Sequence, residues 1–232
     1  AFGISNAEAA ANAIESGPPE QATKKSDPGS RSSSSSNSRT ARRASAMAGV
    51  RRGLTGIGSN SIMFTLKAYL GEALSYEVVI EIPRGSRNKY EVDHETGKVW
   101  LDRVLFTPFV YPVDYGAFEN TLGGDGDPLD ALVLLEYPVY PGVHMSVRPV
   151  GMLLMEDDGG QDEKLLCVLD KDPRFAHIQD IQDVPQQTKN EIEHFFEHYK
   201  DLEPGKWVKL GGWQNKAAAE KVLADGYANF KG

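Results

Sequence analysis

Hydrophobic and polar residues first follow a regular order after Phe64, and that order is typical of short β-strands. Residues 76–82 (YEVVIEI) are rich in β-branched side chains and end at Pro83. Residues 89–93 alternate, residues 94–97 have the composition of a hairpin turn, and residues 98–105 provide the return strand. The pattern therefore predicts that the folded part of the chain begins with a β-hairpin.

Further strands are predicted at residues 131–136, 144–155 and 164–169. Turn signals separate them, among them Tyr140–Gly142 and Asp157–Gly160. Short strands at this spacing predict a small, closed, antiparallel β-barrel.

Toward the C-terminus the hydrophobic period changes to that of a helix. Val184 and Pro185 open it, and its apolar stripe is formed by Ile192, Phe195, Phe196 and Tyr199. The helix should stop near residues 201–205, and residues 206–210 predict one more short strand. Asn215 is suited to cap a second helix over residues 216–229. The predicted fold class is α+β, mainly β: a barrel with two packed helices in one domain, residues 63–232.

Residues 1–62 have a different composition, dominated by Ser, Arg, Gly and Ala. A segment this poor in large apolar side chains is expected to be disordered, because it buries too little surface to offset chain entropy. Two interpretations stay open. The segment is either an organellar transit peptide or an extension that precedes a domain starting at Met63.

Charge and cysteine content exclude several classes of protein. The whole chain has a formal net charge of −8, and residues 63–232 alone carry −12, with 17 Lys/Arg and 29 Asp/Glu. An acidic surface disfavours nucleic acid as a partner. Cys167 is the only cysteine, which fits a reducing compartment. No apolar run approaches the roughly 20 residues that span a membrane, so no membrane partner is expected.

The strongest chemical signal is the segment Asp125–Asp130 (DGDPLD), in which three carboxylates fall within six residues. Carboxylates this close repel one another unless cations lie between them, and hard divalent ions are the usual partners. The apolar run of residues 131–135 follows at once and anchors this acidic turn to a predicted buried strand. The pattern favours a magnesium site used for chemistry.

Other charged residues extend this candidate site. A second acidic turn holds Asp157, Asp158 and Asp162, and the first hairpin contributes Glu81 and Glu91. The basic residues near the same segments are Lys89, Arg103, Lys164 and Lys200. Carboxylates that bind Mg²⁺, with Lys and Arg nearby, suit a phosphate substrate, because metal ions and cationic side chains share its negative oxygens.

Simpler interpretations accompany these candidates. The second acidic turn could be a solvated turn, whereas Glu81 within an apolar strand is costly to bury alone. Tyr111, Tyr115 and Tyr199 either pack in the core or present hydroxyl groups to a phosphate. An EF-hand does not fit Asp125–Glu136, because its sixth position is Asp130 where glycine is required. The five histidines show no zinc-ligand spacing with the cysteine.

Several motifs together resemble the family I soluble inorganic pyrophosphatases, in the family's order and spacing. They are DGDPLD at 125–130, IEIP at 80–83, NKYE at 88–91, Asp102–Arg103, Tyr111–Gly116, RPVG at 148–151 and HFFEHYKDL at 194–202. Residues 87–97 and 122–134 are most similar to short bacterial members, actinobacterial ones in particular. The resemblance covers residues 76 to about 213.

The resemblance implies Mg²⁺-dependent hydrolysis of inorganic diphosphate to two phosphates, by a metal-activated water that attacks in line. It implies several Mg²⁺ ions per site. The implied metal ligands are Asp125, Asp130, Asp157, Asp162, Glu81 and Glu91. The implied phosphate contacts are Lys89, Arg103, Tyr115, Lys164, Tyr199 and Lys200. The implied general base is Asp127, with Asp162 as the alternative.

The resemblance also implies an OB-like five-stranded barrel, a cytoplasmic enzyme and a homohexamer, whereas the longer eukaryotic members are dimers. An organellar location is the alternative if residues 1–62 are a transit peptide. A function of another class is a non-enzymatic OB-type module that binds nucleic acid or a partner protein. The charge of −12 and the placement of the carboxylates favour the enzyme.

Overall fold

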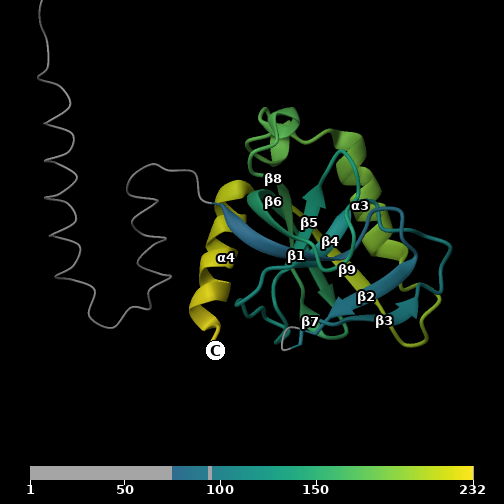
Figure 1. The fold of residues 1–232 in the computed structure, drawn as a ribbon. Helices are drawn as coiled ribbons and strands as arrows, with labels where there is room; N and C mark the ends of the chain where they lie inside the picture. Colours follow the sequence, from purple (N-terminus) through teal and green to yellow (C-terminus); the bar gives the residue numbers. More distant parts are fainter. Residues whose placement is uncertain (1–74, 94–95, 232) are drawn as a thin grey trace, which may run out of the picture. The chain divides into compact units, whose positions relative to one another are not determined.

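The computed structural model describes residues 75–93 and 96–231, which form a β-barrel flanked by two helices (Figure 1). The ring of five strands consists of β1 (Tyr76–Ile82), β4 (Asp114–Ala117), β5 (Asp130–Leu134), β8 (Lys164–Leu169) and β6 (His144–Asp157). The ring closes because β1 pairs with β4 on one side and with β6 on the other. The predicted five-stranded barrel is confirmed. The predicted leader and its boundary at residue 63 lie outside the described residues.

The prediction of an entirely antiparallel barrel is wrong at one pair of strands. β5 and β8 run parallel, with Asp130 opposite Lys164 and Leu134 opposite Val168. β6 runs antiparallel to both β1 and β8, so β8 has the direction of β1. β4 runs antiparallel to both β1 and β5, so β5 has that direction as well. Because the two strands are parallel, their first residues, Asp130 and Lys164, lie at the same end of the barrel.

Four further strands extend the sheet structure. β2 (Asn88–Val92) and β3 (Val99–Val104) form the predicted hairpin, which stands apart from the barrel sheet (Figure 1). Its turn is closed by Asp93 N–H donating to Lys98 O, 2.9 Å, while His94 and Glu95 lie outside the described residues. β9 (Val208–Asn215) pairs with β6, and the two-residue β7 (Gly160–Gln161) ends the turn after β6.

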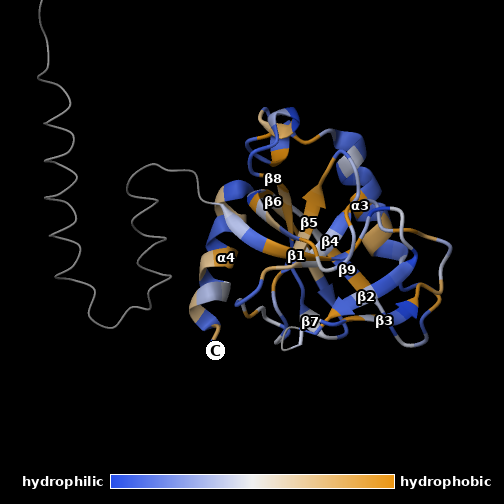
Figure 2. Ribbon diagram, in the orientation of Figure 1, coloured by the Kyte–Doolittle hydropathy of each residue, from blue (hydrophilic) through white to orange (hydrophobic). Residues whose placement is uncertain are grey.

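Two helices cover the barrel and complete two hydrophobic cores. α3 (Gln186–His198) buries Ile192, Phe195 and Phe196 against strands β5, β6 and β8, as its apolar stripe predicts. α4 (Lys216–Asn229) buries Ala219 and Leu223 in the second core. The strands between them are apolar on both faces, and Figure 2 shows this most plainly for β5. Neither helix of the described part is long and apolar enough to cross a membrane.

The helix ends follow local chemistry. Asn215 caps α4 as predicted, since its side chain accepts a hydrogen bond from Ala218 N–H at 3.0 Å. α3 follows Pro185 but ends at His198, a few residues earlier than predicted. The sequence patterns also missed β4 and two short 3₁₀ turns, Pro173–Phe175 and Ile181–Asp183.

The strand register collects the chemically interesting residues at one end of the barrel. In the paired strands, Ala117 lies opposite Asp130, Asp130 opposite Lys164, and Lys164 opposite Leu153. The acidic turn precedes β5, Asp162 precedes β8, and Asp157 ends β6. The residues that follow α3 and the β2–β3 hairpin also border this end, as the lining of the cavity described next shows.

Candidate active site

A cavity of about 550 Å³ opens at this end of the barrel. All thirteen residues named above as metal ligands, phosphate contacts or the base line it: Glu81, Lys89, Glu91, Arg103, Tyr115, Asp125, Asp127, Asp130, Asp157, Asp162, Lys164, Tyr199 and Lys200. They come from seven strands, from the turns before β5 and β8, and from the residues that follow α3. The structure therefore brings the predicted set into one place.

Lys164 lies at the centre of the cavity wall, with only 3% of its side chain exposed. Its ammonium group donates to Asp130 and, at 2.5 Å, to Asp162. Burial alone would lower the pKa of Lys164, but the two carboxylates outweigh burial and raise it. The side chain therefore stays charged and holds two candidate metal ligands together from the floor of the site.

Two carboxyl groups in the wall hold their protons unusually well. Burial raises the pKa of Glu81 to about 7, although Val92 N–H donates to its Oε1 at 3.0 Å. Burial and the charge of Asp130 raise the pKa of Asp162 to about 6, against the opposing effect of Lys164. The nearby cations do not fully compensate these buried charges, so a further cation would stabilise the ionised forms.

The acidic turn has its own internal support. Asp125 Oδ1 accepts from Asp127 N–H at 3.0 Å, and Gly123 N–H donates to Asp127 O at 2.7 Å. Burial, reinforced by the charges of Asp162 and Asp127, raises the pKa of Asp125. The turn holds Asp125 in the cavity wall and leaves the Asp127 side chain exposed to the cavity.

The remaining cations are paired with carboxylates around the rim. Lys200 donates to Asp157 at 2.6 Å, and this contact outweighs burial and lowers the pKa of Asp157. Lys89 pairs with Glu91, and Arg103 donates through Nε to Glu203 at 3.1 Å. Each cation is thus held at the cavity while keeping further N–H groups for a phosphate oxygen.

Of the three tyrosines that the sequence left open between core and site, Tyr115 and Tyr199 line the cavity and Tyr111 does not. Tyr199 packs against Phe195 and Phe196 and is 6% exposed, yet it also lines the cavity. Tyr115 lies on β4, with its hydroxyl 3.5 Å from Lys164 Nζ. Burial and the surrounding carboxylates raise the pKa of both phenols, so both hydroxyls remain protonated donors. Tyr111 is core, at 2% exposed, and does not line the cavity.

Two charged residues of the cavity, Glu203 and Lys206, were missed in the sequence, and a third, Asp158, was named there only as part of an acidic turn. Glu203 holds Arg103, and Lys206 pairs with Asp158. Asp158 belonged to the second acidic turn, but Glu203 and Lys206 looked like part of the turn after the helix. The signal that could have found them is the charge on both sides of Pro204–Gly205.

Together the cavity has nine carboxylates and five Lys/Arg side chains, a formal net charge of −4. A wall of this sign repels a polyanion, whereas the oxygen-only donor set suits hard divalent cations. Cations bound among the carboxylates would reverse the local sign, and the fixed Lys and Arg groups would then bind the outer phosphate oxygens. The geometry fits phosphoryl transfer to water.

Comparison with known proteins decides the family. The family model described as inorganic pyrophosphatase matches residues 78–231, more than half of the chain. The chain belongs to the inorganic pyrophosphatase family. Among its relatives, the inorganic pyrophosphatase of Leifsonia xyli is 67% identical over 157 residues, covering 68% of this chain and 96% of the relative. That of Corynebacterium glutamicum is 60% identical over 158 residues, 68% of this chain and 99% of the relative.

Solved structures of pyrophosphatases agree with this assignment. The crystal structure of the inorganic pyrophosphatase from Thermus thermophilus superposes with a TM-score of 0.66 at 53% identity, covering 68% of this chain and 92% of that one. The structure from Helicobacter pylori gives a TM-score of 0.66 at 49% identity, covering 68% and 94%. The resemblance to bacterial pyrophosphatases, actinobacterial ones included, is confirmed, and so is the prediction of an enzyme that hydrolyses pyrophosphate. The alternative of a non-enzymatic OB-type module is not supported.

Proposed function

We propose that this pyrophosphatase requires Mg²⁺ and hydrolyses inorganic diphosphate through a water molecule that attacks phosphorus in line. The observation that carries the proposal is the convergence of six carboxylates and six phosphate-binding donors on one cavity. When bound, Mg²⁺ ions would neutralise phosphate oxygens and lower the pKa of a water molecule that they bind. The chain's own residues position the substrate and accept the proton.

Six side chains are proposed to hold the metal ions: Asp125, Asp130, Asp157, Asp162, Glu81 and Glu91. All are carboxylates, the ligand type that Mg²⁺ prefers. The raised pKa values of Glu81, Asp125 and Asp162 support this assignment, because they mark a place where negative charge exceeds the local positive charge.

Asp127 is proposed as the general base, with Asp162 as the alternative. Among the described residues, Asp127 forms no ion pair, and its exposed side chain reaches into the cavity, so its carboxylate is available to a water molecule. Asp162 is instead engaged by Lys164 at 2.5 Å. This ion pair leaves the Asp162 carboxylate less available to a water molecule than that of Asp127.

The phosphate groups are proposed to bind to Lys89, Arg103, Lys164 and Lys200 and to the hydroxyls of Tyr115 and Tyr199. The side chain of Arg103 is oriented by Glu203, and that of Lys200 by Asp157. Their fixed positions would reduce the side-chain entropy lost when the transition state forms.

Removal and return of metal test the proposal directly. Phosphate release from pyrophosphate should fall to background in EDTA and return when Mg²⁺ exceeds the chelator. A sample treated with EDTA and then Ca²⁺ controls for general stabilisation by a divalent ion, since Ca²⁺ accepts looser, longer coordination than Mg²⁺. Full activity in EDTA would contradict the requirement for a metal.

A homohexamer is the proposed assembly. Exposed apolar side chains on β3 support contact between copies of the chain: Trp100 is 59% and Leu101 55% exposed. Size-exclusion chromatography with light scattering should give about six chain masses, whereas two would indicate the dimer. The proposed compartment is the cytoplasm, which suits a chain whose single cysteine is a buried free thiol.

Residues 63–232 are proposed as the catalytic domain, and residues 1–62 as a leader. The family match at 78–231 supports this division, because it lies wholly within the proposed domain. N-terminal sequencing of the protein from its source would show whether residues 1–62 are retained.

A further inference from the structure

A second group of metal-ligand side chains lies outside the active site. It consists of Glu77, Glu119 and His144, none of which lines the cavity. We propose that these three residues form a separate binding site for a transition-metal ion of the Zn²⁺ class. The proposal does not rest on the catalytic function.

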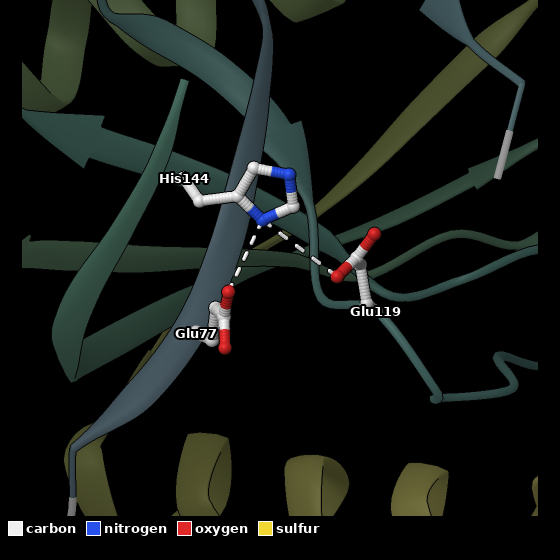
Figure 3. A group of neighbouring side chains, drawn as sticks. All are labelled: Glu77, Glu119 and His144. Atoms are coloured by element: carbon white, nitrogen blue, oxygen red, sulfur yellow. Dashed lines mark hydrogen bonds and ion pairs between the residues drawn. The ribbon is translucent and has the colours of Figure 1, made fainter. Parts of the chain in front are cut away.

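The three side chains converge although they are far apart in sequence. Figure 3 shows the two carboxylates directed at the same imidazole ring. His144 Nδ1 lies 3.1 Å from Glu77 Oε1 and 3.7 Å from Glu119 Oε2. One donor atom from each residue falls within 4.8 Å of the other two.

The separations of 3.1 Å and 3.7 Å are close to those of ligands around one ion. Two donor atoms bound at about 2.0–2.2 Å, at tetrahedral or octahedral angles, lie about 3.0–3.5 Å apart. An ion among the three donors would therefore require only small side-chain rotations. A simple ion pair between His144 and one carboxylate would not explain the second carboxylate, because two like charges repel each other.

The backbone beneath each donor is held by the barrel. Glu77 lies on β1 and His144 begins β6, and these strands pair with Glu77 opposite Ser146 and Val79 opposite His144. Glu77 and His144 are therefore diagonal neighbours on one face of the sheet. The adjacent backbone is fixed by Ile80 N–H donating to Val143 O at 2.9 Å.

Glu119 is held just as firmly, two residues after β4. Phe118 N–H donates to Leu129 O at 2.9 Å, and Phe118 O accepts from the Thr121 hydroxyl at 2.6 Å. Asn120 has a φ of 60°, which turns the chain immediately after Glu119. The backbone at all three donors is thus fixed by the barrel, so binding an ion would order side chains but not the main chain.

The types of donor atom determine which class of metal ion would bind. An imidazole with two carboxylates suits Zn²⁺ and related ions, whereas Mg²⁺ prefers oxygen donors alone. The side chains of Glu77, His144 and Glu119 are 68%, 48% and 32% exposed, so an ion reaches them from solvent and keeps water in its remaining positions. The active site and this site therefore differ in metal preference.

Zinc binding to the full chain, with Mg²⁺ in excess, tests the proposal. Competition with a chromogenic zinc chelator should show one more zinc ion per chain in the wild type than in His144→Ala. Glu77→Gln should weaken that site at least tenfold, because it removes a charged ligand but changes shape little. His177→Ala, which alters another exposed histidine, should leave zinc binding unchanged.

Two readouts separate a metal site from an ion pair and from a folding defect. Zinc should shift the ring nitrogen signals of His144 in the Mg²⁺-loaded protein, and Mg²⁺-supported pyrophosphatase activity should be unchanged in His144→Ala and Glu77→Gln. Equal zinc stoichiometry and affinity in the wild type and both variants would overturn the proposal. Ring nitrogen signals of His144 that do not shift at saturating zinc would overturn it as well.

Discussion

Lys164 and Asp127 show how differently the fold treats two charged residues of one cavity. Lys164 is almost fully buried between Asp130 and Asp162, where it compensates two carboxylates. Asp127 is exposed to the cavity on the acidic turn. The first residue is therefore important for the stability of the site, whereas the second is free for proton transfer.

Asp127→Asn should lower kcat about 10²- to 10⁴-fold, the usual contribution of a general base. Mg²⁺ affinity should change little, because Asp127 is not one of the proposed ligands. Steady-state phosphate release over a range of Mg²⁺ concentrations measures both quantities, and Asp225→Asn on the exposed face of α4 is the matched control. Near-normal kcat in Asp127→Asn, with a large loss in Asp162→Asn at unchanged Mg²⁺ affinity, would assign the base to Asp162.

Lys164→Met should destabilise the metal-free protein by about 3–5 kcal/mol at pH 8, because two buried carboxylates lose their shared partner. Mg²⁺ should restore part of this loss, so its addition should raise the melting temperature more in the variant than in the wild type. Urea unfolding with and without Mg²⁺ gives the comparison, with the exposed Lys171→Met as control. Equal stability of Lys164→Met and wild type would show that Lys164 does not compensate the carboxylates.

At the scale of elements, the sites depend on strands that are packed very closely. β4 lies against β1 so tightly that a Cβ at Gly116 would fall 2.0 Å from Val79 O and 2.8 Å from Ile80 Cα. These are backbone atoms of the neighbouring strand and do not move aside as a flexible side chain would. β4 carries Tyr115 and leads into Glu119, so the close approach positions parts of both proposed sites.

Gly116→Ala should therefore destabilise the protein by about 3 kcal/mol, the upper range for overpacking. The matched control is Gly124→Ala, where the added Cβ would meet atoms at an ordinary 3.5 Å. Chemical denaturation at fixed Mg²⁺ measures both variants. Wild-type stability in Gly116→Ala would mean that β1 and β4 separate at little cost.

Elements were predictable where a local pattern dictates them. The stripe of α3 and the Asn215 cap of α4 arise from residues close in sequence, so both helices were found. β4 was missed because it has only four residues, too few to show a period. The parallel pairing of β5 with β8 was also missed, because alternation in a strand reports its faces but not its direction.

On the scale of the whole molecule, two buried carboxyl groups of the candidate metal site link the stability of the fold to pH. Glu81 has a pKa of about 7 and Asp162 of about 6, both above the values of unfolded chains. The folded metal-free protein therefore holds these protons more tightly than the unfolded chain. Their contribution to stability is fully present only below about pH 4 and is lost as the pH rises through about 6–7.

Metal binding should have the opposite pH dependence. Mg²⁺ competes with the protons on Glu81 and Asp162, so its affinity should be at least about tenfold weaker at pH 5 than at pH 8. Isothermal titration at the two pH values measures the ratio, and Glu81→Gln should reduce it. Glu191→Gln, at an exposed position of α3, should leave the ratio unchanged. Equal Mg²⁺ affinity of the wild type at the two pH values would show that Glu81 and Asp162 do not bind the metal.

The sequence by itself determined the mostly β fold and the two helices, because hydrophobic period and cap chemistry are local properties of the chain. Its acidic motifs indicated a metal site, and its resemblance to the pyrophosphatase family extended that site to all thirteen residues. Only the tertiary structure decided that Tyr199 is both core and cavity wall, that Lys164 compensates two acids, and that Glu203 orients Arg103. It also brought Glu77, Glu119 and His144 together. Such juxtapositions depend on strand order and register, which join distant segments and leave no local pattern.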